Sequence, residues 1–318
     1  MKRKIFALCI VSILILSFVG CAKNTNKTTE TQTNLEETSA ENILNSYPMT
    51  VLDSMGRSIT FESMPERIVS TVPSNTEIIY AVGKGNNLVG DSVYCNYPEE
   101  ALAVAKIGDY NGPNLELIIG LKPDVVFSAW LGDDVLTQLE SAGIKVVLIN
   151  PGNLEQIYDS ISLIGNIVGA ESETLTLISD MKIKQEEIIQ KVKGYSPKSV
   201  FFEVWNDPLM SAGPGSFINE LITLSNGINI AGDAESAYPE YSLETLISKN
   251  PQVYITADDG FKTAEDIFTR EGYENIEAIK TGQLFMLHQD IISRPSPRII
   301  DGLELVSRAI HPEAFDDK

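Results

Sequence analysis

The sequence predicts an α/β protein made of two similar lobes joined by helix. Three observations indicate this fold class. β-rich runs alternate with helical patterns from Pro48 onward, one helix–turn–strand unit occurs twice, and the stretch between its copies has helical apolar spacing. A chain of 318 residues is also long for one hydrophobic core, which favours two units.

The repeated unit consists of a short helix, a proline turn and a buried strand. Its first copy spans residues 115–127 with Pro123 at the turn, and its second spans 243–255 with Pro251 at the turn. Two copies indicate two related lobes, because a solenoid stacks more repeats than this. Between them, 154–168 and 171–192 carry helical apolar spacing and predict a stiff connector.

Local patterns predict further elements. Residues 67–72 form a β-rich run that Pro73 interrupts. Residues 74–77 (Ser-Asn-Thr-Glu) have the spacing of a capping box, for a helix that Gly83 can end. Additional strands are predicted at 88–90, 145–149 and 284–287.

The N-terminus has the pattern of a lipoprotein signal. Three basic residues at 2–4 precede an apolar run from Ile5 to Val19, which is short for a membrane span. The run ends at Gly20-Cys21, which resembles a bacterial lipobox, although Phe18 replaces the usual leucine. A plain signal peptide with an incidental cysteine is the alternative.

The chain is therefore divided by composition and pattern into five segments. Residues 22–46 contain hardly any apolar side chains and predict a flexible tether, because such a segment cannot offset its ordering entropy by burial. The predicted segments are a signal peptide (1–20), a tether after lipidated Cys21 (21–46), an N-terminal α/β lobe (47–153), a helical connector (154–195) and a C-terminal α/β lobe (196–318).

Charge and composition exclude several classes of protein. Asp and Glu number 44 against 24 Lys and Arg, so the formal net charge is -20, which argues against nucleic-acid binding. Loss of the signal peptide removes cations and no acids, and lowers the charge to about -23. The 3 cysteines and 2 histidines are too few for a disulfide framework or a multi-histidine metal site, so no resident metal or cofactor is expected.

Two glutamates occupy the same offset in the two copies of the repeat. Asn114 and Ser242 are good N-caps, which places Glu116 and Glu244 in the first turns of their helices. The helix dipole stabilises a carboxylate there by about 0.3–1 kcal/mol, and this local role explains either residue alone. The recurrence in both lobes favours a second role, in which the pair docks cationic groups of a partner.

Aromatic residues in loop-like contexts and one polar segment are candidate ligand contacts. Ordinary packing explains several of the aromatics, and a crevice between lobes explains them as the lining for a large, partly apolar ligand. Asp290, Arg294 and Arg298 follow a predicted strand and either bind polar ligand groups or pair with one another. The aromatic set is Tyr94, Tyr97, Tyr110, Trp130, Trp205, Tyr238 and Tyr241.

Several short motifs occur in a defined order and spacing between about Val51 and Ile310. They are DSMGR at 53–57, PERIVS at 65–70, PSNTE at 73–77, YCNYP at 94–98, NLE at 114–116, LKPD at 121–124 and SPR at 296–298. Through these motifs together the chain resembles the Fe/B12 periplasmic-binding family, the solute-binding proteins of ABC importers for cobalamin, iron chelates and haem.

The resemblance implies two α/β lobes bridged by a single long helix, with a ligand cleft between the lobes. It implies that Glu116 and Glu244 dock onto the ABC permease dimer, and that the ligand brings its own metal. Cobalamin-binding members are closest in motif. Their cleft positions correspond here to Tyr94, Tyr110, Trp130, Met210, Tyr238, Asp290 and Arg294, with Trp205 added from the aromatic set. Residues 110 and 238 change from Trp to Tyr and residue 210 from Phe to Met, which leaves the ligand open.

We therefore expect a monomeric, lipid-anchored protein on the outer face of the cytoplasmic membrane. We expect it to bind a metal-chelate nutrient and to have no enzymatic activity. The candidate ligands, in order of preference, are a corrinoid, a ferric siderophore and haem. An extracytoplasmic hydrolase using an acidic pair is the alternative from another class, and it lacks an active-site motif in the sequence. A zinc or manganese importer protein would need more histidines than the chain has.

Overall fold

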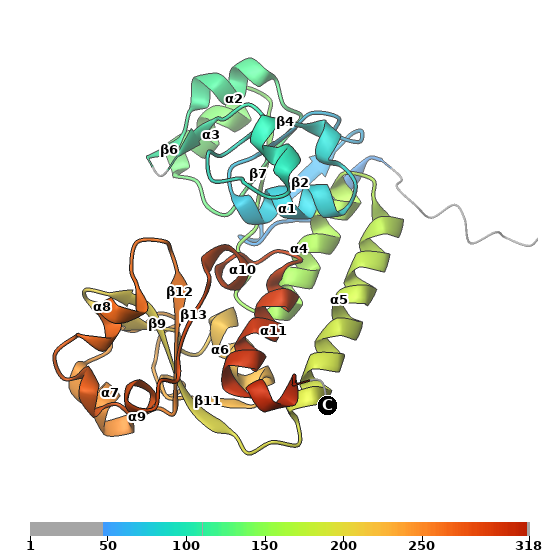
Figure 1. Ribbon diagram of the computed structural model, residues 1–318. Helices are drawn as coiled ribbons and strands as arrows, with labels where there is room; N and C mark the ends of the chain where they lie inside the picture. The colour runs from blue at the N-terminus through green and yellow to red at the C-terminus, as the bar shows by residue number, and fades with distance from the viewer. Residues whose placement is uncertain (1–46, 110, 317–318) are drawn as a thin grey trace, which may run out of the picture. The chain divides into compact units, whose positions relative to one another are not determined.

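The structure is a computed structural model that describes residues 47–109 and 111–316 (Figure 1). The signal peptide, Cys21 and the tether were predicted within 1–46 and lie outside the described residues, as does Tyr110. The described part is the expected α/β fold, with two largely parallel sheets and their helices.

The N-terminal lobe contains a four-stranded parallel sheet in the order β4 (Leu88–Asp91), β3 (Ile68–Ser70), β7 (Val125–Ser128) and β8 (Lys145–Leu148). Its strands are mostly buried apolar residues, as expected where helices cover a parallel sheet. Its other elements are β1 (Met49–Leu52), β2 (Ser58–Phe61), α1 (Pro73–Ala81), η1 (Gly85–Asn87), η2 (Glu99–Ala103), β5 (Gly108–Asp109), β6 (Gly112–Pro113), α2 (Leu115–Leu121) and α3 (Asp133–Ser141).

The C-terminal lobe contains a five-stranded sheet. Its order is β10 (Leu209–Ser211), β9 (Lys198–Asn206), β12 (Val253–Asp258) and β13 (Leu284–His288), and β11 (Gly227–Asn229) pairs with the start of β9. β10 is antiparallel to β9, and the other pairings of this sheet are parallel. Its remaining elements are α6 (Phe217–Leu224), α7 (Leu243–Lys249), α8 (Ala264–Phe268), η3 (Tyr273–Asn275), α9 (Glu277–Lys280), α10 (Gln289–Ser293), α11 (Ile299–Ile310) and η4 (Pro312–Ala314).

Two helices form the connection between the sheets, α4 (Leu154–Ile167) and α5 (Glu171–Val192). They lie where the apolar spacing predicts them, and the domain boundaries drawn around them remain predictions. With 22 residues, α5 extends about 33 Å. The two helices approach closely at Gly165, where an added Cβ would lie 1.9 Å from Oγ1 of Thr174. In Figure 1, α5 runs alongside α4 and α11.

The predicted repeat is confirmed in detail. α2 and α7 each contain 7 residues and end at a left-handed residue, Lys122 (φ 49°) or Asn250 (φ 44°). A proline follows one position later in each copy, at Pro123 and Pro251, and the next strand is β7 or β12. The proline turn therefore serves the same purpose twice, which is to stop the helix and start a central strand.

The capping box predicted at 74–77 is wrong. α1 begins at Pro73, and its N-cap Val72 makes no side-chain cap hydrogen bond. Proline is favoured in the first turn because its missing N–H needs no partner there. Glu77 is thus free of a capping role, and its carboxylate binds residues from the other lobe.

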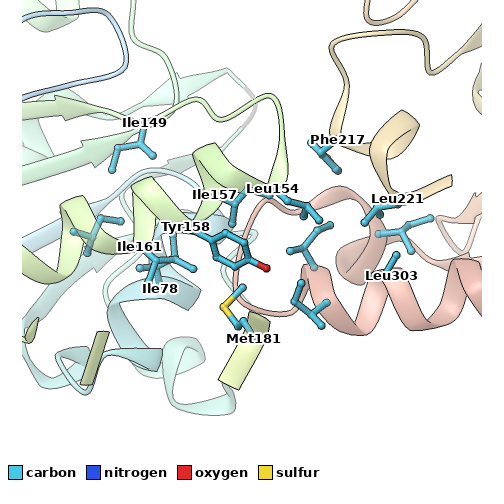
Figure 2. Packing of buried hydrophobic residues seen from close by; sticks show 14 of the residues in the cluster. Ile78, Ile149, Leu154, Ile157, Tyr158, Ile161, Met181, Phe217, Leu221 and Leu303 are labelled. Atoms are coloured by element: carbon cyan, nitrogen blue, oxygen red, sulfur yellow. The ribbon is translucent and has the colours of Figure 1, made fainter. Parts of the chain in front are cut away.

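A hydrophobic cluster runs through both lobes and the connecting helices. Figure 2 shows part of it, with side chains from α1, α4, α5, α6 and α11 packed together. The cluster joins residues of the N-terminal sheet such as Phe127 to residues of the C-terminal sheet such as Phe202. The side chains labelled in Figure 2 include Ile78, Ile157, Tyr158, Ile161, Met181, Leu221 and Leu303.

Candidate functional site

The N-terminal lobe places Tyr94 and Trp130 beyond the carboxyl ends of its strands. Ser70, the last residue of β3, pairs with Asp91 of β4 and with Phe127 of β7, so the three strands end in one row. Tyr94 follows the end of β4 and Trp130 follows the end of β7. The Trp130 side chain is 75% exposed, so this sheet edge presents an indole ring to solvent.

The C-terminal lobe repeats this arrangement. Thr256 of β12 pairs with Glu203 of β9, and Asp258 of β12 pairs with His288 of β13, so the ends of these strands also lie in one row. Trp205 lies next to the end of β9 and is 54% exposed. The carboxyl ends of parallel strands are the usual position of ligand sites in α/β folds.

Met210 lies beside Trp205, and Tyr238 belongs to the loop that follows β11. Met210 on β10 pairs with Trp205 across the antiparallel strands, and it also forms an isolated bridge with Glu240. Tyr238 is close to Glu240 in the chain and is half-exposed, and burial raises the pKa of its phenol. The phenol is therefore neutral at pH 7 and can donate a hydrogen bond. Trp205 and Met210 therefore lie on adjacent strands, the segment that contains Tyr238 runs next to Met210, and the ligand contacts of all three remain predictions.

Asp290 and Arg294 link the two sheet edges through direct contacts. The Arg294 guanidinium donates to Oδ1 of Asn96 (2.7 Å) and to the carbonyl oxygen of Tyr94 (3.2 Å). Asn96 donates in turn to Oδ2 of Asp290 (2.9 Å), and Asp290 pairs with Arg294 at 2.7 Å. These contacts bring the loop after β13 against the loop after β4. The binding of ligand by Asp290 and Arg294 remains a prediction, since both already have protein partners.

Glu77 is the central carboxylate of this contact, and sequence reasoning missed its role. It is 3% exposed and accepts hydrogen bonds from Arg294 (2.9 Å), from Ser296 (2.6 Å) and from Arg298 at both Nε (2.9 Å) and Nη2 (2.5 Å). Two guanidinium groups therefore neutralise one buried carboxylate. The available signal was the acidic residue in PSNTE together with the paired arginines near SPR, but no local rule connects them.

Two aromatics of the candidate set have packing roles. Tyr241 donates to the carbonyl oxygen of Ile230 (3.0 Å) and lies 5.2 Å from Phe201 between ring centroids, within the core of the C-terminal lobe. The Tyr97 ring lies 3.9 Å from the Arg298 guanidinium carbon, a cation–π distance. Packing explains Tyr241, and support of Arg298 explains Tyr97.

A buried ionic cluster supports the carboxyl edge of the C-terminal sheet. Glu203 of β9 is completely buried and pairs with Lys262 (3.3 Å) and Arg270 (2.5 Å), and the Tyr254 hydroxyl donates to it as well. Burial raises the pKa of Glu203, but hydrogen bonds from Arg270 and Tyr254 outweigh burial and hold it below its usual value. The cluster fixes the loop that follows β12, because Lys262 belongs to that loop.

Glu116 and Glu244 are both exposed and both lie in first helical turns, as predicted. Asn114 Oδ1 accepts from the Leu117 amide (3.1 Å), and Ser242 Oγ accepts from the Thr245 amide (3.0 Å). Each cap leaves its neighbouring carboxylate at the surface. The two helices therefore present equivalent acidic groups, one on each lobe.

The part of the chain that the structure describes contains no group of three or more His, Cys, Asp or Glu side chains able to hold a metal ion. Across 47–109 and 111–316, no helix has the length and apolar character of a membrane span. Cys95 is a buried free thiol beside Thr76, and burial raises its pKa to about 11.

Comparison with known proteins decides the family. The model of a family described as periplasmic binding protein matches residues 68–291, which include the carboxyl edges of both sheets. The chain belongs to the periplasmic binding protein family. One similar protein is an ABC transporter substrate-binding lipoprotein of Bacillus subtilis, which is 35% identical over 85% of this chain and 88% of that protein. Another is the vitamin B12-binding protein of Salmonella typhimurium, which is 32% identical over 74% of this chain and 86% of that protein.

Solved structures agree with this assignment to the periplasmic binding proteins. A possible iron-binding periplasmic solute-binding protein of Staphylococcus epidermidis superimposes with a TM-score of 0.70, at 29% identity, over 78% of this chain and all of that chain (100%). The vitamin B12-binding protein of Vibrio cholerae superimposes with a TM-score of 0.69, at 27% identity, over 80% of this chain and 99% of that chain. The two-lobed fold of this periplasmic binding protein is therefore shared with both structures.

Proposed function

We propose that this protein captures a corrinoid outside the cytoplasm and delivers it to the permease of an ABC importer. The naming of relatives as vitamin B12-binding proteins supports this ligand, and the naming of the Bacillus relative supports the transport role. The observation that carries the proposal is the pair of linked sheet edges, each with exposed aromatic side chains at its strand ends.

The aromatic edges suit a large ligand with an apolar ring surface. Trp130 is 75% exposed, Trp205 is 54% exposed and Tyr238 is 45% exposed, whereas aromatic rings are normally buried or partly covered. Each such ring can cover roughly 150–250 Å² of ligand or protein surface. A corrin or porphyrin ring offers an extended face of this kind, and a small hydrophilic chelate does not.

The charges of the strand-end loops favour a ligand without net negative charge. In the described loops that follow the strands of both sheets, the cations are Lys106, Lys262, Arg294 and Arg298. Lys106 pairs with Asp91, Lys262 pairs with Glu203, and the two arginines pair with Glu77. An anionic ligand such as haem, with its two carboxylates, would need a cation that is already engaged, and releasing one would leave a buried carboxylate unpaired.

Titration calorimetry of the mature chain against cobalamin, cobinamide, haem and ferric siderophores tests the proposal. We expect cobalamin and cobinamide to bind at least about tenfold more tightly than haem, a difference of about 1.4 kcal/mol. If a siderophore or haem binds more tightly than the corrinoids, that ligand takes the place of the corrinoid in the proposed function. A chain that binds none of the four would contradict the transport function as a whole.

A ferric siderophore is the second candidate ligand, supported by the name of the Staphylococcus epidermidis structure, and haem is the third. Either one would need a different use of Asp290 and Arg294, in which their present partners are exchanged for ligand groups.

We further propose that Glu116 and Glu244 bind cationic groups on the two subunits of the permease. Their exposure and equivalent positions on two similar lobes support a partner with two equivalent binding surfaces. Lipidation of Cys21 would hold the protein, as a monomer, at the outer face of the cytoplasmic membrane. The lipoprotein name of the Bacillus relative supports the anchor.

A further inference from the structure

Phe261 is the most exposed large apolar side chain of the described residues, at 95%. It lies in the loop between β12 and α8, shortly after Asp258, the last residue of β12. Asp258 is in register with His288, so the loop starts at the same carboxyl edge that carries Trp205. Sequence analysis did not select it, because a single phenylalanine in a polar loop has no distinguishing pattern.

The backbone around Phe261 is held in a defined turn. Asp259 Oδ1 accepts from the amide of Phe261 (2.9 Å) and from the amide of Lys262 (3.2 Å). Gly260 adopts φ 75°, a left-handed conformation that glycine reaches without strain. Immediately after the loop, Thr263 and Asp266 form a capping box that starts α8. The turn is therefore built by specific side chains on both sides of the ring.

The next residue is anchored in the interior. Lys262 Nζ donates to Oγ1 of Thr256 (2.7 Å) and to Oε1 of Glu203 (3.3 Å), and both partners are completely buried. The two successive side chains thus have opposite environments, since Lys262 is bound to the core and Phe261 is almost fully in water. Leaving an aromatic ring in water is unfavourable. Single exposed apolar side chains are common on protein surfaces, but this one stands on a built and anchored turn at the carboxyl edge of the sheet, where α/β folds bind ligands.

We propose that Phe261 is a ligand-contact residue, which packs against the apolar ring face of the bound chelate. This inference rests on the proposed function and deepens it, because it adds a specificity-determining residue to the C-terminal edge. Trp205 and Tyr238 contact the ligand from the β9–β10 side of that edge, and Phe261 contacts it from the β12 side. The ligand class that benefits is a macrocycle with an extended apolar face.

The test compares Phe261→Ala with Phe268→Ala and Phe261→Tyr in the full mature chain. Phe268 ends α8 and is 37% exposed, so its variant makes the same truncation nearby, away from the strand ends. Phe261→Ala should raise the Kd of cobalamin about tenfold, the effect of losing one well-packed aromatic contact. Phe261→Tyr should bind like the unmodified chain because it keeps the ring, and Phe268→Ala should change the Kd less than about twofold.

Thermal unfolding and uptake assays separate the alternatives. The two Phe261 variants should unfold at nearly the same temperature as the parent, because the exposed ring has no packing role. An unchanged Kd in Phe261→Ala would overturn this inference alone, and a loss of uptake with that unchanged Kd would assign Phe261 to the permease contact instead. Failure of the parent chain to bind cobalamin, cobinamide, haem or a siderophore would overturn the proposed function together with the inference.

Discussion

Among single residues, Glu77 connects the two lobes through one buried carboxylate. Its carboxylate accepts from Arg294, Ser296 and Arg298, which lie 217, 219 and 221 positions away in the sequence. A buried charge pair is costly to desolvate, so its net stabilisation is small, but removal of one partner is strongly destabilising. The position of Asp290 also depends on Glu77, because both carboxylates share the Arg294 guanidinium.

Replacement of Glu77 by glutamine should destabilise the fold by about 3–5 kcal/mol, because it leaves two partly buried guanidinium groups with less negative charge. Urea unfolding measures this change. The matched control is Glu140→Gln, which removes a carboxylate that is 50% exposed and pairs with Arg57 at 2.9 Å. The control should lose less than about 1 kcal/mol. Equal losses in the two variants would show that Glu77 is no more than a surface partner.

At the scale of secondary-structure elements, α2 and α7 are the clearest outcome of the repeat. Each starts with a side-chain cap, carries one acid in its first turn and ends at a left-handed residue before a proline. The cap and the dipole explain why an acid is tolerated at these positions. They do not require the same acid on equivalent helices of two lobes, and the proposed docking to a partner with two equivalent surfaces would account for that recurrence.

The double variant Glu116→Arg with Glu244→Arg should bind cobalamin with an unchanged Kd and lose most uptake into cells, at least about tenfold, because cations would then face cationic groups on the permease. Glu173→Arg with Glu277→Arg is the control, since both are exposed acids in first helical turns and the charge change is identical. Uptake should survive in the control. Normal uptake by the Glu116 and Glu244 variant would refute the docking role.

At the scale of the whole described molecule, the continuous hydrophobic cluster limits how far the lobes can move. It includes residues of both sheets and of α4, α5 and α11, and the Glu77 contacts join the lobes at a second place. A wide hinge rotation would expose part of this cluster to water, at about 25 cal/mol for each Å² of apolar surface. Small adjustments around α4 and α5 leave it covered.

Small-angle scattering of the ligand-free and cobalamin-saturated chain should therefore give nearly superimposable profiles, with no marked fall in the radius of gyration. The Glu77→Gln variant offers a comparison, since loss of one of the two connections should permit more motion in the ligand-free form. A large compaction of the parent chain on saturation would contradict the rigid connection inferred from the cluster.

Local sequence patterns predicted much of the fold and part of the site. The helix–proline–strand repeat, the caps at Asn114 and Ser242 and the helices at 154–168 and 171–192 were all predicted, because each depends on residues within a few positions of one another. The predicted capping box at 74–77 was wrong for the same reason, since a rule based on neighbours takes no account of a distant partner for Glu77.

The two-lobed α/β class, the equivalent positions of Glu116 and Glu244 and the scarcity of histidine and cysteine all follow from the sequence alone. Three features emerge only in the folded chain. They are the side chains that lie at the sheet edges, the pairing of both Arg294 and Arg298 with Glu77, and the exposure of Phe261 on an anchored loop. The physical reason is distance along the chain. Helix propensity and turn chemistry act between near neighbours, whereas charge pairing and exposure depend on which loops the two sheets bring together.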